Sequence, residues 1–174
     1  MAEPAGDVVR RISLLGVPLD ANSSYLAGAA AGPRASRAAL HSDSHNSSSE
    51  ASVEGLAHLE DLGDVAITNQ PGSSADADAI SDAIGVELAA GRQTITLGGD
   101  HSITYPILRA FRPHHEDLTV VHIDAHPDLY DDLDGNPLSH ASPFARAMDA
   151  GCMSRLVQLG IRTATPHQRE QAAR

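Results

Sequence analysis

Residues 118–128 read LTVVHIDAHPD, in which an apolar, β-branched run passes directly into a segment of potential metal ligands. The apolar half, residues 118–123, predicts a buried strand. Asp124, His126 and Asp128 follow at alternate positions, and an extended segment would point all three side chains to one side. Packing two carboxylates and an imidazole this closely is unfavourable unless a cation neutralises them. A polar turn capped by Asp is the alternative, but it does not explain the histidine between the carboxylates, so the pattern favours a metal site.

A second strand, residues 93–97, runs into the pentapeptide GGDHS at residues 98–102. Two successive glycines allow the backbone to turn sharply and to approach a ligand closely. His101 would then project from the start of a helix, directly after the strand. Taken alone, the pentapeptide fits a tight turn with a helix-capping Asp or Ser equally well.

Predicted strands and helices alternate along the rest of the chain. Strands are expected at residues 11–17, 64–67, 93–97, 118–123 and 156–161, and helices at residues 32–40, 76–90, 102–111, 142–150 and from residue 165 onward. This alternation predicts an α/β fold with one three-layer, doubly wound parallel sheet and helices on both faces. In such sheets, sites form outside the carboxyl ends of the strands. Both ligand-rich segments fall there.

The bulk composition excludes several classes of protein. The formal net charge of −11, from 23 acidic and 12 basic residues, argues against nucleic acid and anionic membranes as partners. The single cysteine, Cys152, excludes an intramolecular disulfide. No apolar run approaches the roughly 20 residues needed to span a bilayer, and residues 1–9 do not read as a signal peptide. We therefore expect a cytoplasmic enzyme.

Aromatic residues make up only 3% of the chain, and there is no tryptophan. The core must therefore be built from Ala, Val, Leu and Ile, which bury less area per residue. A partner surface, or the rest of a larger domain, is expected to complete it.

The ligand types indicate which metal would bind. Oxygen and imidazole ligands without thiolate suit Mn²⁺ or another divalent ion of similar hardness, with Zn²⁺ as an alternative. His101, Asp124, His126 and Asp128 together exceed what one open catalytic site needs. Two metals are therefore implied, and a shared carboxylate could bridge a pair about 3.5–4 Å apart.

Together these segments resemble the arginase/agmatinase ureohydrolase family. GGDHS and DAHPD look like two of that family's metal motifs, and their combination is highly specific. Further similarity, closest to plant-type arginases, covers nearly the whole chain: GVPLD at 16–20, GPR at 32–34, the stretch from Tyr130 to Asn136, SHASPFAR at 139–146, LGIR at 159–162 and REQ at 169–171. Ala141, where many members have glycine after the histidine, matches the plant-like subgroup.

The resemblance implies a role for individual residues. His101 and Asp128 would bind one manganese, His126 the other, and Asp124 would bridge the pair. His140 would be the proton shuttle or acid, and Asn136 and Ser139 would contact the substrate. The implied reaction is manganese-dependent hydrolysis of a small cationic guanidinium substrate by a metal-activated hydroxide. L-Arginine, giving ornithine and urea, is favoured over agmatine, and a trimer or hexamer is expected.

The chain also departs from the family. The third metal motif and the glutamate expected to receive the guanidinium group are absent from residues 1–174. We therefore expect a single, incomplete ureohydrolase domain whose C-terminal part is missing and which is inactive alone. A non-catalytic metal-binding fragment is the second hypothesis. A deacetylase of the same general fold is a distant third, because GGDHS and both aspartates of DAHPD argue against a single-zinc site.

The remaining histidines are not expected to be ligands. His122 lies inside a predicted strand, where a histidine is more often a core residue or a support for the ligands. The others are expected at the surface: His41, His45, His58, His114, His115 and His167.

Overall fold

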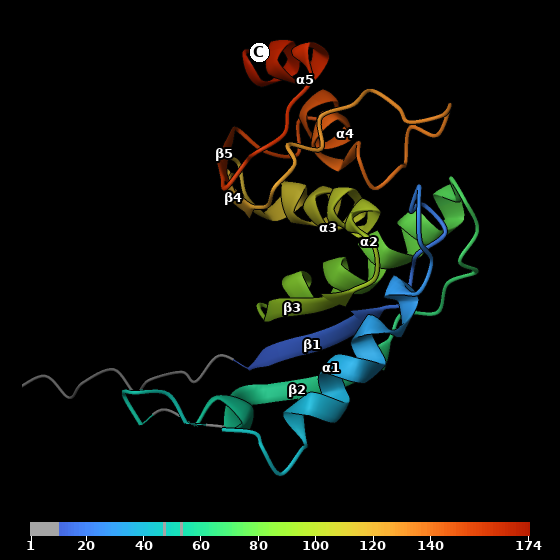
Figure 1. Ribbon diagram of the computed structural model, residues 1–174. Helices are drawn as coiled ribbons and strands as arrows, with labels where there is room; N and C mark the ends of the chain where they lie inside the picture. The colour runs from blue at the N-terminus through green and yellow to red at the C-terminus, as the bar shows by residue number, and fades with distance from the viewer. Residues whose placement is uncertain (1–10, 47, 53) are drawn as a thin grey trace, which may run out of the picture.

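The computed structural model describes residues 11–46, 48–52 and 54–174, so the expectation for residues 1–9 lies outside the described chain. Five strands are described: β1 (Ile12–Val17), β2 (Leu59–Asp64), β3 (Gln93–Gly98), β4 (Thr119–Ile123) and β5 (Arg155–Leu159). All pairings between these strands are parallel, which confirms the predicted α/β class. Within the described residues, however, the strands form two sheets, β2-β1-β3 and β4-β5, and not the single sheet that the sequence predicted (Figure 1).

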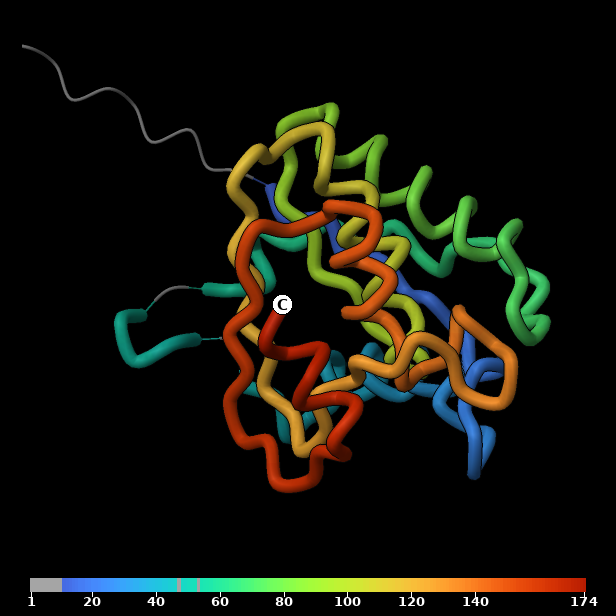
Figure 2. Tube along the Cα trace, turned by 90° about the horizontal axis from the view of Figure 1, so that it is seen from above, coloured from blue at the N-terminus to red at the C-terminus, as the bar shows by residue number. Residues whose placement is uncertain are grey.

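The helices cover both faces, as expected for a doubly wound fold. They are α1 (Gly32–Leu40), α2 (Ser74–Ala89), α3 (Thr104–Phe111), α4 (Pro143–Asp149) and α5 (Pro166–Ala172), with 3-10 turns at Ala29–Ala31, Gly55–His58, His101–Ile103 and Arg112–His114. Right-handed crossovers explain the layers. The chain passes from β1 to β2 in one direction and from β2 to β3 in the other, so α1 and α2 lie on opposite faces. α2 packs against α3, and α3 packs against α4. α5 is uppermost in Figure 1 and nearest the viewer in Figure 2.

One strand lies earlier than the sequence predicted. The apolar residues 64–67 suggested a strand there, whereas β2 covers Leu59–Asp64. β2 is an edge strand with mostly exposed side chains, so its own sequence, LEDLGD, carries no apolar pattern. Val65 and Ile67 instead follow the strand and pack against the buried cluster of Val17, Leu19, Ile80 and Ile103.

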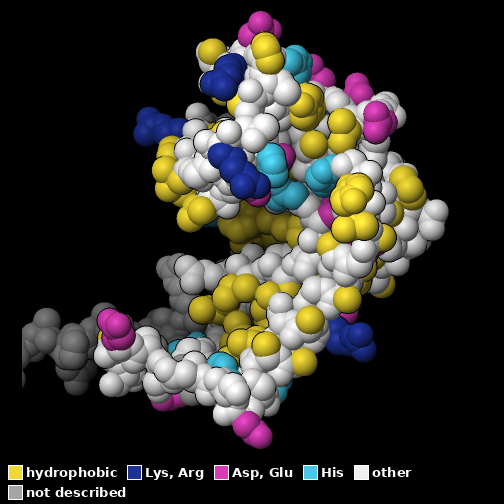
Figure 3. Space-filling view, viewed as in Figure 1, with side chains coloured by type: hydrophobic (Ala, Val, Ile, Leu, Met, Phe, Trp, Pro, Cys, Tyr) yellow, Lys and Arg dark blue, Asp and Glu magenta, His cyan; other side chains and the backbone are white. Residues whose placement is uncertain are grey.

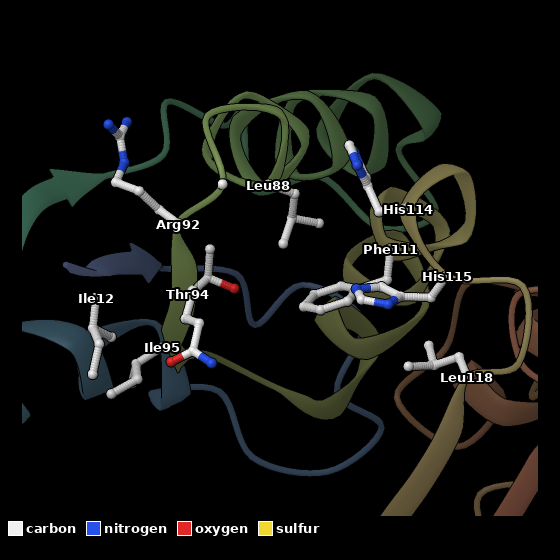
Figure 4. A pocket seen from close by; sticks show the side chains of 11 residues that line it. Ile12, Leu88, Arg92, Thr94, Ile95, Phe111, His114, His115 and Leu118 are labelled. Atoms are coloured by element: carbon white, nitrogen blue, oxygen red, sulfur yellow. The ribbon is translucent and has the colours of Figure 1, made fainter. Parts of the chain in front are cut away.

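The two sheets are separated by an open groove. Each of β3 and β4 has an edge with no partner strand among the described residues, and apolar side chains stay exposed nearby, at 45% for Ile95, 60% for Val121 and 78% for Ile123. A cavity of about 680 Å³ opens between the start of β3 and Leu118, which precedes β4 (Figures 3 and 4). These uncovered apolar residues agree with the expectation that this chain alone does not complete its core. In the part of the chain that is described, no helix has the length and apolarity needed to cross a membrane.

Candidate metal centre

In the segment after β3, Asp100 is buried and His101 is directed toward the group of potential ligands. Gly99 has a φ of +75°, in the left-handed region that glycine adopts without strain. Asp100 is 7% exposed, and its carboxylate accepts hydrogen bonds from the backbone N–H groups of Ser102 (2.9 Å) and Asn22 (3.1 Å). The helix-capping interpretation is thus correct for Asp100. His101 comes next and turns toward the end of β4.

Four potential ligand atoms meet where β3 and β4 end. They belong to His101, His122, Asp124 and Asp128, and they all lie within 4.8 Å of one another. His101 follows β3, His122 is inside β4, and the two aspartates follow β4. The structure therefore brings together His101, Asp124 and Asp128 from the predicted set, and it adds His122, which the sequence placed in a supporting role.

His101 and Asp128 form the tightest contact of the group. His101 Nδ1 lies 2.5 Å from Asp128 Oδ2. Asp128 is 7% exposed, and its φ of +50° is one that Asp adopts more readily than most residues. The His101 ring stacks on that of His122, with centroids 5.0 Å apart, and meets the Phe144 ring edge-on at 5.5 Å. Packing therefore fixes the direction in which both rings point.

Asp124 sits between two histidines. Its Oδ2 is 3.6 Å from His122 Nε2, and its Oδ1 is 3.4 Å from His126 Nδ1. Burial raises the pKa of the Asp124 carboxyl, but hydrogen bonding from the His126 backbone N–H and the nearby His122 and His101 outweigh it, so the pKa is lowered overall. Asp124 is therefore a carboxylate at neutral pH.

His126 differs from the other predicted ligands. Its side chain is 56% exposed, and it is not part of the four-residue group. Its backbone N–H donates to Asp124 Oδ1 (2.8 Å), which keeps the residue beside the site. The role of His126 as a metal ligand stays a prediction.

The charges of this group fit a divalent cation. Within the described chain, the ion-pair contacts of Asp124 and Asp128 are to histidines alone, and no Lys or Arg reaches them. Burial and the neighbouring His101 lower the pKa of His122, so this ring is neutral at physiological pH. Two carboxylates thus face a pocket of imidazoles without a compensating cation from the protein. A bound metal ion would supply the missing charge.

The residues predicted to act on substrate lie on the loop before α4. His140 Nδ1 is 2.9 Å from the carbonyl oxygen of Asn22, so Nδ1 carries the proton and Nε2 is left with its lone pair, 3.4 Å from Ser24 Oγ. Asn136 and Ser139 line one hollow of about 150 Å³ together with Asn22 and Ser24. Asn136 and Ser139 therefore line a common space at the loop after Leu19, and His140 contacts Asn22 and Ser24, which line it too.

Sequence reasoning missed Asn22 and undervalued His122. The side-chain oxygen of Asn22 accepts a hydrogen bond from Asn136 Nδ2 (3.0 Å), and its side-chain nitrogen donates one to Ser102 Oγ (3.0 Å). Each bond joins residues more than 70 positions apart in the sequence. No local sequence pattern predicts contacts between such distant residues. His122 could have been found, because it extends the alternation of Asp124, His126 and Asp128 back by two residues into the strand.

The other histidines lie outside the group. His41, His114, His115 and His167 are exposed as predicted, while His45 and His58 are half-buried.

Comparison with known proteins matches this chain to one family. The model of the Arginase family matches residues 10–174. "Arginase 1, mitochondrial" of Oryza sativa subsp. indica is 40% identical over 177 residues, covering 97% of this chain and 52% of that protein. "Agmatinase, mitochondrial" of Gallus gallus is 39% identical over 155 residues, covering 86% of this chain and 45% of that protein. The solved structure of arginase from Medicago truncatula superposes with a TM-score of 0.85 at 37% identity, covering 97% of this chain and 55% of that one. The chain thus spans about half the length of the curated relatives it matches.

Proposed function

Because this chain belongs to the arginase family, whose model matches residues 10–174, we propose that it contributes a binuclear manganese site for hydrolysis of L-arginine to ornithine and urea. The observation that carries this proposal is the convergence of His101, Asp124 and Asp128 at the ends of β3 and β4. Activity is proposed for the protein that contains this chain.

The proposed ligands divide between two ions. His101 and Asp128, which contact each other through His101 Nδ1, would hold one ion, and the proton between them would be released on binding. Asp124 would be shared between the two ions, and His126, which lies beside Asp124, would hold the other. Bound manganese would supply a water of lowered pKa as the nucleophile. Oxygen and imidazole donors without thiolate support manganese as the metal.

His140 is proposed to move the proton. Its Nδ1 is committed to the carbonyl oxygen of Asn22, so Nε2 is the atom available for proton transfer. Nε2 would carry a proton to the leaving amine as the C–N bond of the guanidinium group breaks. The hydrogen bond to Asn22 fixes the ring orientation that this transfer needs.

The hollow beside His140 is proposed to receive the substrate's α-amino and α-carboxyl groups. Ser23, Ser24, Asn136 and Ser139 supply hydroxyl and amide groups, and Asp134 supplies a carboxylate that suits an ammonium. Arginine carries both α-groups, whereas agmatine has no carboxylate. The polar lining therefore supports arginine, while the similarity to an agmatinase keeps agmatine as the alternative substrate.

Urea release distinguishes these substrates. The manganese-loaded protein should release urea from L-arginine with a higher kcat/KM than from agmatine. Asn136→Ala should raise KM for arginine about 10- to 150-fold while changing KM for agmatine little, since loss of one hydrogen bond to a charged group costs on the order of 1.5–3 kcal/mol. Asn46→Ala, in the exposed loop after α1, is the matched control and should match the wild type. Equal loss for both substrates would contradict the assignment of Asn136.

A metal-binding fragment without activity is the second candidate function. The observation in its favour is that the chain spans about half the length of its relatives. Manganese bound by the 174-residue chain without urea release from either substrate would favour it. Turnover by this chain alone would exclude it.

Self-association is part of the proposal. Apolar side chains on β4 and β5 are uncovered, with Val157 at 38% and Leu159 at 50% exposure, beside Val121 and Ile123. Burying such a face favours assembly. A trimer or hexamer is expected in light scattering, and a monomer at micromolar concentration would contradict this part.

A further inference from the structure

Gln158 fixes which nitrogen of His122 carries the proton. On β5, the Gln158 side-chain nitrogen lies 2.7 Å from the carbonyl oxygen of Pro127 and 3.0 Å from His122 Nδ1. A carbonyl oxygen can only accept a hydrogen bond, so the group facing Pro127 must be the NH₂ of Gln158. That NH₂ has no lone pair to offer His122. His122 Nδ1 is therefore the acceptor, and its proton sits on Nε2.

The protonated Nε2 points at Asp124. It is 3.6 Å from Asp124 Oδ2, and it is a buried donor with no hydrogen-bond partner among the described residues. The His122 side chain as a whole is 6% exposed, so water does not satisfy it. An unsatisfied buried donor costs free energy. A small rotation of the Asp124 carboxyl group would remove that cost.

The ring itself cannot turn away. His122 stacks against His101, with ring centroids 5.0 Å apart, and packs against Phe144, with centroids 4.5 Å apart. The pairing of β4 with β5 places His122 directly opposite Gln158, so the backbone sets the contact between them. Backbone pairing, ring stacking and the Gln158 amide thus together keep His122 Nε2 directed at Asp124.

We propose that His122 is a positioning residue, held by Gln158 as the Nε2–H tautomer, which donates to Asp124 Oδ2 and orients this carboxylate toward the metals. This inference rests on the metal centre proposed above. It excludes His122 as a ligand, although its Nε2 lies in the four-residue group, because a protonated nitrogen has no lone pair for a metal. Groups that orient ligands in this way typically change metal affinity 10–100-fold when removed.

Two variants of Gln158 test the tautomer of His122 in the absence of metal. In ¹⁵N-histidine-labelled protein at pH 8, where an ordinary histidine of pKa about 6.5 is neutral, two-bond ¹H–¹⁵N spectra should show His122 with its proton on Nε2. His122→Gln identifies the signal by removing it. Gln158→Glu replaces the donor with an acceptor and should move the proton to Nδ1. Gln158→Leu offers neither a donor nor an acceptor to His122 Nδ1 and should give a mixture of the two His122 tautomers. A wild-type His122 protonated on Nδ1, or spectra that do not respond to Gln158→Glu, would overturn the proposal.

Manganese affinity tests the positioning role, and it can be measured by electron paramagnetic resonance without turnover. His122→Leu should weaken binding 10–100-fold, whereas His122→Gln, whose amide can still donate to Asp124, should recover most of it. Equal manganese affinity of His122→Leu and His122→Gln would overturn the positioning role of His122. A wild-type chain that binds no manganese would overturn the metal centre itself, while the tautomer spectra would still decide whether Gln158 controls His122.

Discussion

Gly99 provides a test of how the end of β3 is shaped. A Cβ at this position would lie 2.5 Å from the Val17 carbonyl oxygen and 2.8 Å from that of Leu19, and both are backbone atoms that cannot move independently. Gly99→Ala therefore adds steric overlap, about 1–3 kcal/mol for a tightly packed site, to the cost of about 1–2 kcal/mol for a left-handed φ. Gly91, at φ +73°, has nothing within 4 Å of its added Cβ.

Gly91→Ala is consequently a matched control, with nearly the same φ and no clash. Both variants lose the same chain entropy in the unfolded state, so that contribution cancels between them. Urea denaturation followed by circular dichroism should show that Gly99→Ala lowers the free energy of unfolding by about 1–3 kcal/mol more than Gly91→Ala does. Equal losses for the two variants would refute the close approach of β3 to the Val17–Leu19 backbone.

Two further predictions concern charge and catalysis. The hydrogen bond from Arg92 lowers the pKa of the Glu87 carboxyl, against the effect of burial and with the help of Ser13. Because the folded pKa is the lower one, Glu87 stabilises the fold fully above the ordinary value of about 4.3, and this contribution is lost as pH falls through the lowered pKa. Urea titrations should therefore show the stability advantage of wild type over Glu87→Gln shrinking between pH 6 and pH 3, and a constant difference would contradict this. His140→Asn, which can keep the hydrogen bond to the Asn22 carbonyl, should lower kcat for arginine about 10²–10⁴-fold with unchanged manganese affinity; a matching loss of affinity would show that His140 supports the metals.

The sequence predicted best where side chains are buried in a regular pattern. The apolar run before Asp124 and the β-branched run before Gly98 both correspond to strands, β4 and β3. His101 and Asp128 follow the carboxyl ends of these strands, where sites form in α/β folds. The helix that begins after Thr165 was also readable, since its capping box and Pro166 are local signals.

Contacts that join distant segments were not predictable. β2 is an exposed edge strand, and its position follows from pairing with β1 and not from its own composition. The separation of β3 from β4 depends on which strands find partners, and single-strand patterns do not contain that information. The tautomer of His122 likewise depends on Gln158, which lies 36 residues away on the neighbouring strand.

Manganese binding by the 174-residue chain, with Asp128→Asn compared against Asp117→Asn, tests the central claim most directly. Asp117 precedes β4 at its other end, roughly 20 Å from Asp124 at about 3.3 Å per residue. Electron paramagnetic resonance titration should show saturable uptake of Mn²⁺ by the wild type and by Asp117→Asn, and its loss in Asp128→Asn. No saturable uptake, or equal uptake by the two variants, would contradict a metal centre at the ends of β3 and β4.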